Sequence, residues 1–246
     1  MVSNISSATS APVYTVLDQK LHSGPVIFDG SEGANAMSMT NANFQTLWHS
    51  DVGYIFPQFN GSATLSLQVG EKTGNWANIG TSTQPPTTVD LFAAWIQHID
   101  ISVPISYTMV PGVNQKAFVK KQNSNQLQQL QEIQNDGSIS AVLDQANQLA
   151  FFVFWQAEGG NVTFTPKANV APITITTNAN IALIYRLKTG EVTVSDPSQS
   201  LSIAQVSLNL GTGNKPPHWG SGDVKTLVFQ LPSGGLIGSS VTLNIN

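Results

Sequence analysis

The stretch Ala63-Thr64-Leu65-Ser66-Leu67-Gln68-Val69 places an apolar residue at every second position. A strand with this alternation buries one face and leaves the other in water. The same alternation occurs at residues 105–109 and 181–187, and residues 224–231 and 241–245 predict two further strands. Clusters of glycine, proline, asparagine and aspartate separate these segments, as turns do. The sequence therefore predicts an all-β fold of antiparallel β-sandwich architecture.

Four segments carry additional local signals. A phase shift at Ala204-Gln205 predicts a β-bulge. Residues 151–155 are apolar on both faces, which is typical of a central strand. Residues 114–121 favour one short helix, whereas residues 127–133 have helical propensity but an ambiguous period.

The composition of the 246-residue chain excludes several classes of protein. The absence of cysteine excludes disulfides and thiolate chemistry. Only 10% of the residues are charged, the net charge is −4 and Arg186 is the only arginine, so we expect no nucleic-acid partner. No apolar run is long enough to span a membrane. Amides and hydroxyls supply most of the polar groups instead.

The sequence contains no familiar catalytic or metal-binding motif. The signatures of nucleotide-binding loops, serine hydrolases and zinc proteases are all absent. The four histidines are scattered, and no pair has the spacing of zinc ligands. The acidic residues are also dispersed, so the sequence does not pair the two carboxylates of a glycosidase. We therefore expect no metal and no cofactor.

Aromatic residues beside neutral hydrogen-bonding groups are the main functional signal. An aromatic plate with amides nearby suits the apolar face and the hydroxyls of a sugar ring. The carbohydrate-binding candidates are His218 and Trp219 in a Gly/Pro-rich loop, followed by Trp76, Asn75 and Asn78 beside a turn. The alternative is that these aromatic residues belong to the core, and it stays open at this point.

Five segments carry motifs of one protein family, in that family's order. They are Tyr14-Thr15-Val16-Leu17-Asp18-Gln19, Trp48-His49-Ser50-Asp51-Val52-Gly53-Tyr54-Ile55-Phe56-Pro57, Thr73-Gly74-Asn75-Trp76-Ala77-Asn78-Ile79, Phe92-Ala93-Ala94-Trp95-Ile96-Gln97-His98 followed by Tyr107-Thr108-Met109-Val110-Pro111-Gly112, and Val194-Ser195-Asp196-Pro197-Ser198-Gln199. Together they resemble polysaccharide lyase family 8, the hyaluronate, chondroitin and xanthan lyases.

This resemblance implies a fold and a missing catalytic part. The chain is expected to cover the later half of the family's super-sandwich, as residues 1–165, and the small C-terminal β-domain, as residues 166–246. It also implies strands at residues 127–133, 138–142 and 150–155. The family's catalytic Asn, His, Tyr and Arg lie in a helical toroid and the cleft beside it. That toroid has no counterpart here, so the resemblance carries over no catalytic residue.

Three functions follow as hypotheses. The first is a non-catalytic, lectin-like carbohydrate-binding protein that favours neutral sugars, because few cations are present to pair with uronates or sulfates. The second is a polysaccharide lyase, or part of one, acting by β-elimination on uronate-containing glycans. The third is a structural, storage or defence protein that acts through self-assembly. A half sandwich exposes an edge, so we also expect a homo-oligomer, most simply a dimer.

The start of the chain leads to an expectation about location. Residues 1–6 contain neither the basic region nor the apolar region of a secretory signal. We therefore expect a cytoplasmic or unconventionally secreted protein, and an extracellular one if the sequence is truncated at its start.

Overall fold

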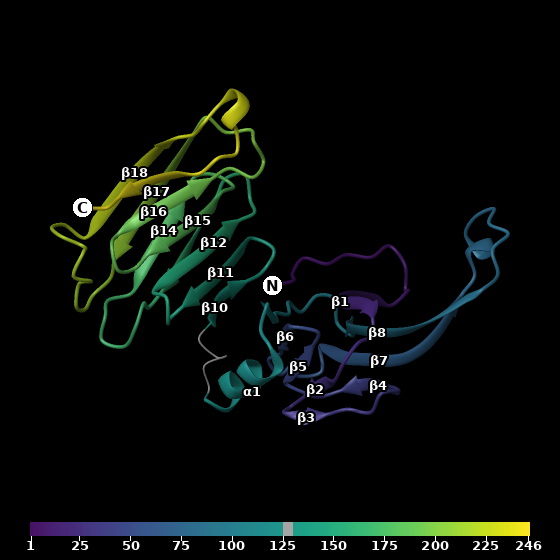
Figure 1. The fold of residues 1–246 in the computed structure, drawn as a ribbon. Coiled ribbons are helices and arrows are strands. Elements are labelled where there is room, and N and C mark those ends of the chain that lie inside the picture. The colour runs from purple at the N-terminus through teal and green to yellow at the C-terminus, as the bar shows by residue number, and fades with distance from the viewer. Residues whose placement is uncertain (125–129) are drawn as a thin grey trace. The chain divides into compact units, whose positions relative to one another are not determined.

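Strands β7 (Ala63–Gly74) and β8 (Thr87–His98) pair antiparallel over twelve residues in the computed structural model, which describes residues 1–124 and 130–246. The chain divides into two compact units, Met1–Leu127 and Gln128–Asn246, which we call the N-unit and the C-unit. The described residues form antiparallel sheets throughout and contain one α-helix (Figure 1). The predicted all-β antiparallel class is therefore confirmed.

Two sheets face each other in the N-unit. The first has the order β1-β8-β7-β4, and the second has the order β3-β2-β5-β6-β9. Their remaining strands are β1 (Val13–Leu21), β2 (Val26–Phe28), β3 (Ser31–Glu32), β4 (Met37–Ala42), β5 (Thr46–His49), β6 (Val52–Ile55) and β9 (Thr108–Pro111). The alternation of residues 63–69 decides which face is buried, because Leu65, Leu67 and Val69 share a core with Leu47 and Phe56.

Helix α1 (Gln115–Asn123) lies against the second of these sheets. Asn114 caps its first turn by accepting a hydrogen bond from the backbone N–H of Ala117, which confirms the predicted short helix. The buried Phe118 packs on Gly53 of β6, where an added Cβ would lie 2.2 Å from the phenyl ring. The glycine at this position is thus required by the close approach of the helix.

The C-unit is a second sandwich with its own core. One sheet has the order β10-β11-β12-β15-β16-β19, and the other has the order β13-β14-β17-β18. The strands are β10 (Leu130–Asn135), β11 (Ile139–Asp144), β12 (Leu149–Phe154), β13 (Gly160–Phe164), β14 (Ile173–Thr177), β15 (Ala182–Arg186), β16 (Glu191–Ser195), β17 (Ile203–Leu210), β18 (Val224–Gln230) and β19 (Val241–Asn244). Short 3₁₀ turns occur at η1 (Trp76–Asn78) in the N-unit and η3 (Gly234–Leu236) here.

The observed division of the chain differs from the predicted one at residues 165 and 166. Strands β10 to β13 belong to the C-unit, because β12 pairs with β15 and β13 pairs with β14. Phe152 and Phe164 from these strands share a core with Ile173 and Leu183. Pro166 and Pro172 bracket a connection inside this sandwich and not a linker between two units.

Two local predictions have different outcomes. The predicted strand at residues 127–133 is confirmed from Leu130 onward, and its first three residues lie outside the described part. The predicted bulge at Ala204-Gln205 is wrong, since β17 pairs in regular register with β14 and β18. The phase signal arose because the small Ala204 points inward while the larger Ile203 is 47% exposed.

A buried aspartate fixes the turn after β16. Asp196 is 2% exposed and accepts hydrogen bonds from the backbone N–H groups of Ser198, Ser200 and Leu201, at 2.8, 2.7 and 2.7 Å. Burial alone would raise the pKa of this carboxyl, but the hydrogen bonds outweigh it and hold the pKa below its ordinary value. One carboxylate therefore replaces the water that three backbone donors would otherwise need.

The substitution Asp196→Ala should destabilise the C-unit strongly. It leaves three backbone donors without their acceptor, so we expect a loss of about 3 kcal/mol in the free energy of unfolding. Asp196→Asn keeps one acceptor oxygen and should lose less. Urea denaturation of both variants measures this, and a loss below about 1 kcal/mol for the alanine variant would contradict the assigned role.

Candidate functional site

The β7–β8 hairpin reaches beyond the sheet that holds it. Pairing with β1 ends at Leu91 and pairing with β4 ends at Val69, whereas β7 and β8 continue to pair with each other as far as Gly74 and Thr87. The outer part is therefore a two-stranded ribbon, seen extending from the N-unit in Figure 1. Residues 75–86 form its tip.

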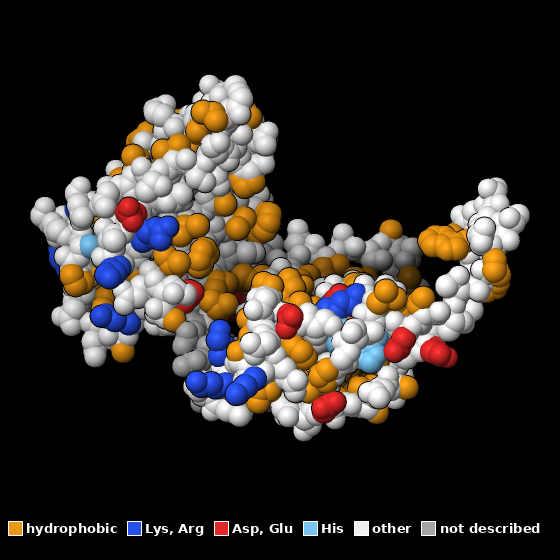
Figure 2. All heavy atoms as spheres, viewed as in Figure 1, with side chains coloured by type: hydrophobic (Ala, Val, Ile, Leu, Met, Phe, Trp, Pro, Cys, Tyr) orange, Lys and Arg blue, Asp and Glu red, His pale blue; other side chains and the backbone are white. Residues whose placement is uncertain are grey.

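The tip presents one of the predicted carbohydrate-binding groups. Trp76 is 61% exposed, and Ile79 beside it is 80% exposed. Asn75 caps the 3₁₀ turn through its side-chain oxygen, which accepts from the backbone N–H of Ala77 at 2.9 Å, and Asn78 is exposed. Hydrophobic side chains lie among polar, uncharged groups at this end of the hairpin (Figure 2). The turn thus holds an indole outward beside amide groups.

The second predicted pair, His218 and Trp219, lies in the C-unit, and the two residues differ in burial. Trp219 is fully buried in the core, and its indole N–H donates to the carbonyl of Gly222 at 3.0 Å. It therefore has no face free to stack on a sugar, contrary to the hypothesis that it is a binding plate. Glycine and proline around Trp219 leave its exposure open in the sequence, and the structure places its indole in the sandwich interior.

His218, the neighbour of Trp219, lines a pocket of about 290 Å³ in the C-unit. Its Nε2 lies 2.6 Å from the hydroxyl of the buried Tyr185, and its Nδ1 is buried without a partner among the described residues. Burial lowers the pKa of His218 and raises that of Tyr185. Both ring nitrogens are therefore unavailable to a ligand, and Lys167 and Lys188 supply the charge of this pocket.

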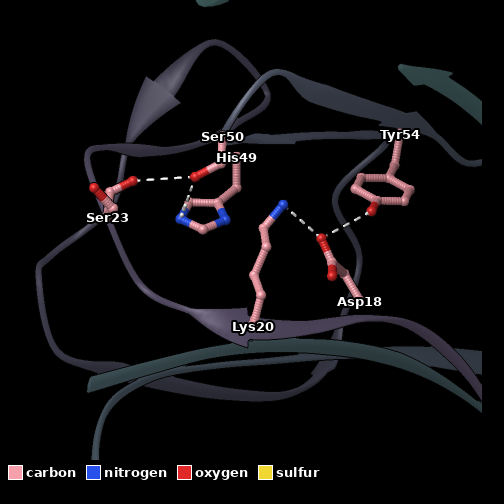
Figure 3. A network of polar contacts seen from close by, with 6 residues as sticks. All are labelled: Asp18, Lys20, Ser23, His49, Ser50 and Tyr54. Atoms are coloured by element: carbon pink, nitrogen blue, oxygen red, sulfur yellow. Dashed lines mark hydrogen bonds and ion pairs between the residues drawn. The ribbon is translucent and has the colours of Figure 1, made fainter. Parts of the chain in front are cut away.

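A polar cluster lies inside the N-unit between its two sheets (Figure 3). Asp18 of β1 accepts from the hydroxyl of Tyr54 at 3.2 Å and pairs with Lys20 at 2.7 Å. His49 packs flat on Phe92, with ring centroids 4.0 Å apart. These contacts join β1 and β8 to β5 and β6, so they hold one sheet on the other.

The same cluster contains residue types that proton abstraction would use, but its tyrosine and histidine are buried away from a substrate. Tyr54 is 2% exposed and His49 is fully buried. Burial raises the pKa of Tyr54, and the nearby Asp18 charge adds to this effect. Burial, followed by the charge of Lys20, lowers the pKa of His49 to about 4. Because both rings are buried, we assign Tyr54 and His49 to packing between the two sheets.

Residues 1–124 and 130–246 contain no group of three or more side chains suited to hold a metal ion. No helix in that part of the chain is long and apolar enough to cross a membrane.

An amide-lined pocket of about 320 Å³ in the N-unit was missed from the sequence. Two short segments enclose it, Asn43-Phe44-Gln45 and Gln58-Phe59-Asn60, and each places an amide on both sides of a phenylalanine. This repeated pattern was the available signal. The two segments flank the β5–β6 hairpin, so only the pairing of these strands brings the two halves of the pocket together.

The two sandwiches occur in the order of the two β-domains of one protein family. A model of the super-sandwich domain of polysaccharide lyase family 8 matches residues 1–122, and a model of the C-terminal β-sandwich domain of the same family matches residues 133–205. The chain belongs to polysaccharide lyase family 8. A search of curated proteins found no match.

Solved structures agree with this fold. A chondroitinase AC lyase studied as enzyme–oligosaccharide complexes aligns with a TM-score of 0.75 and 22% identity over 96% of this chain and 33% of that one. A Paenibacillus xanthan lyase gives 0.60 and 18% over 80% and 20%. A Streptomyces coelicolor A3 chondroitin AC lyase in complex with chondroitin sulphate gives 0.60 and 19% over 97% and 30%. The chain thus spans a third or less of the length of these relatives.

Acid should weaken the N-unit through His49. Its pKa is about 4 in the folded chain against an ordinary 6.5, so its contribution is complete above pH 6.5 and is lost as the pH falls toward 4. The loss should reach at most about 3 kcal/mol. Urea denaturation across this range measures it, and the His49→Gln variant should show a shallower decline. Equal slopes in the two proteins would contradict this assignment.

Proposed function

We propose that this chain is a carbohydrate-binding β-scaffold that holds a polysaccharide without cleaving it. The observation that carries the proposal is the exposed Trp76 at the tip of a ribbon that stands clear of the sheet. Membership of a polysaccharide lyase family supports a glycan as the ligand. Of the three functions expected from the sequence, this is the first, with the β7–β8 hairpin as the binding element.

The tip has the groups that a sugar needs. An indole offers an apolar plate to the C–H face of a pyranose, and the amide of Asn78 is exposed beside it. Lys and Arg together number ten in the whole chain, so attraction to a polyanion is weak and neutral sugars are favoured. Asn75 is a positioning residue, because its side chain fixes the turn that carries Trp76.

The lyase alternative has a specific difficulty in the N-unit. Elimination needs a base that reaches the substrate and groups that neutralise a carboxylate. Tyr54 and His49 are buried, and the only arginine, Arg186, lies in the C-unit at 51% side-chain exposure in a pair with Glu191. The described residues therefore support binding better than cleavage.

The substitution Trp76→Ala should abolish most polysaccharide binding. Loss of a stacked indole is worth roughly 1–3 kcal/mol, so we expect Kd to weaken at least about fivefold. A matched control is Trp155→Ala, which removes a tryptophan of similar exposure, 57%, from the C-unit. Binding is measured by fluorescence titration with chondroitin, hyaluronan, xanthan and a neutral glucan.

Two results would contradict the proposal. Unchanged binding by the Trp76→Ala variant would remove the hairpin as the site. A rise in absorbance from unsaturated uronate product, on incubation of the pure chain with hyaluronan, chondroitin or xanthan, would show cleavage and favour the lyase alternative.

Self-association is a second candidate activity, and strand β1 favours it. In the described N-unit, β1 lies at one end of its sheet and pairs only with β8. Its side chains Tyr14, Val16 and Leu21 are 49%, 64% and 66% exposed. An edge strand with exposed apolar residues is a template for pairing with another strand. A second copy could pair β1 with β1 around a twofold axis.

The substitution Val16→Lys should prevent this pairing. A charge at the centre of β1 repels its own copy across a twofold axis, so the variant should be monomeric while the unmodified chain is a dimer. Light scattering measures the mass. The control is Leu236→Lys, which replaces a residue that is 68% exposed in η3, away from any sheet edge. If the unmodified chain is itself monomeric, self-association through β1 is contradicted.

A further inference from the structure

The amide-lined pocket of the N-unit has an unusual combination of side chains. It contains five amide residues, Asn41, Asn43, Gln45, Gln58 and Asn60. None of the side chains that line it, all within the described residues, carries a charge. Its volume of about 320 Å³ suits a ligand the size of a single sugar ring.

The two segments around the pocket are held by packing and backbone hydrogen bonds. Phe44 is buried and meets Phe56 edge-on at 5.9 Å, and Phe56 meets Phe59 edge-on at 6.5 Å. The backbone N–H of Gln45 donates to the Asp29 carboxylate at 2.9 Å. The backbone is thus fixed on both sides of the pocket before any ligand binds, which lowers the cost of binding.

The amide side chains themselves are not used by this framework. Within residues 1–124 and 130–246, the side chains of these five residues make no hydrogen bond to the protein. Thr64 also lines the pocket, but its hydroxyl is buried and is not one of the groups open to a ligand. Each amide offers both a donor pair and an acceptor, which matches adjacent hydroxyls on a ring.

From this arrangement we infer that the pocket between residues 41–45 and 58–61 binds an uncharged pyranose unit. Phe59, half-buried between Gln58 and Asn60, supplies the apolar contact, and the amides take the hydroxyls. Without a cation in its lining, the pocket offers a carboxylate or sulfate no ion pair, so it favours an uncharged ring over a uronate. In taking a glycan as the ligand this inference rests on the proposed function, but it uses none of the hairpin residues.

An NMR titration that follows the side-chain NH₂ signals tests whether the pocket binds an uncharged pyranose. The probes are methyl glucoside, methyl galactoside, methyl mannoside and methyl N-acetylglucosaminide, with glucuronate as the charged comparison. We expect the NH₂ signals of the five amides to move with at least one neutral glycoside at millimolar concentration and not with glucuronate. The protein is made in a bacterial host that does not glycosylate asparagine, because Asn60-Gly61-Ser62 is a glycosylation sequon.

Variants separate this site from the hairpin. The double variant Asn43→Ala/Gln58→Ala, with one change on each side of the pocket, should weaken the glycoside about tenfold. The control Gln19→Ala/Asn35→Ala removes two exposed amides elsewhere in the N-unit and should bind as the unmodified chain does. The Trp76→Ala variant should keep the glycoside shifts even where it loses polysaccharide, so failure of one site is distinguishable from failure of the other.

Three results would overturn the inference. They are the absence of NH₂ shifts with every neutral glycoside, tighter binding of glucuronate than of its neutral counterparts, and unchanged binding by the double variant when its backbone spectrum shows it to be folded.

Discussion

The long antiparallel pairing of β7 with β8 is the constraint on which the N-unit depends. Its inner part supplies Leu65, Leu67, Phe92 and Ile96 to the core and seats β4 and β1 at its two sides. Its outer part has no such neighbours and becomes the ribbon that carries Trp76. One hairpin therefore both closes the sandwich and exposes the candidate binding group, because period-two alternation gives way to exposed residues along the same strands.

The elements that alternation specifies were predictable, and those that depend on tertiary contact were not. The strands around residues 63–69 and 181–187 and the helix capped by Asn114 follow from local pattern. The division of the chain does not, because the connection from Pro166 to Pro172 resembles a linker in composition while both its flanks share one core. The resemblance to the lyases correctly decided the segment from Leu130 onward, against its helical propensity.

The candidate site shows the same limit in chemical terms. Trp76 and Trp219 have similar polar and glycine-rich surroundings in sequence, yet one is 61% exposed and the other is wholly buried. Sequence predicts that an indole is near a turn but not which side of the turn it occupies. The amide-lined pocket is a stronger case, since Asn43 and Gln58 line the same pocket only when the pairing of β5 with β6 brings their loops together.

The ribbon also has a consequence for local stability. Beyond Val69 its backbone bonds are exposed and no second sheet covers it, so opening it costs only its own hydrogen bonds and cross-strand contacts such as Thr73 with Thr88. Amide hydrogens there should exchange with solvent by local opening long before those of Leu67 or Ile96, which require the sandwich itself to unfold. The tip of such a ribbon is therefore less well ordered than the sheet that holds it. A ligand that contacts both strands would slow the exchange of their amide hydrogens.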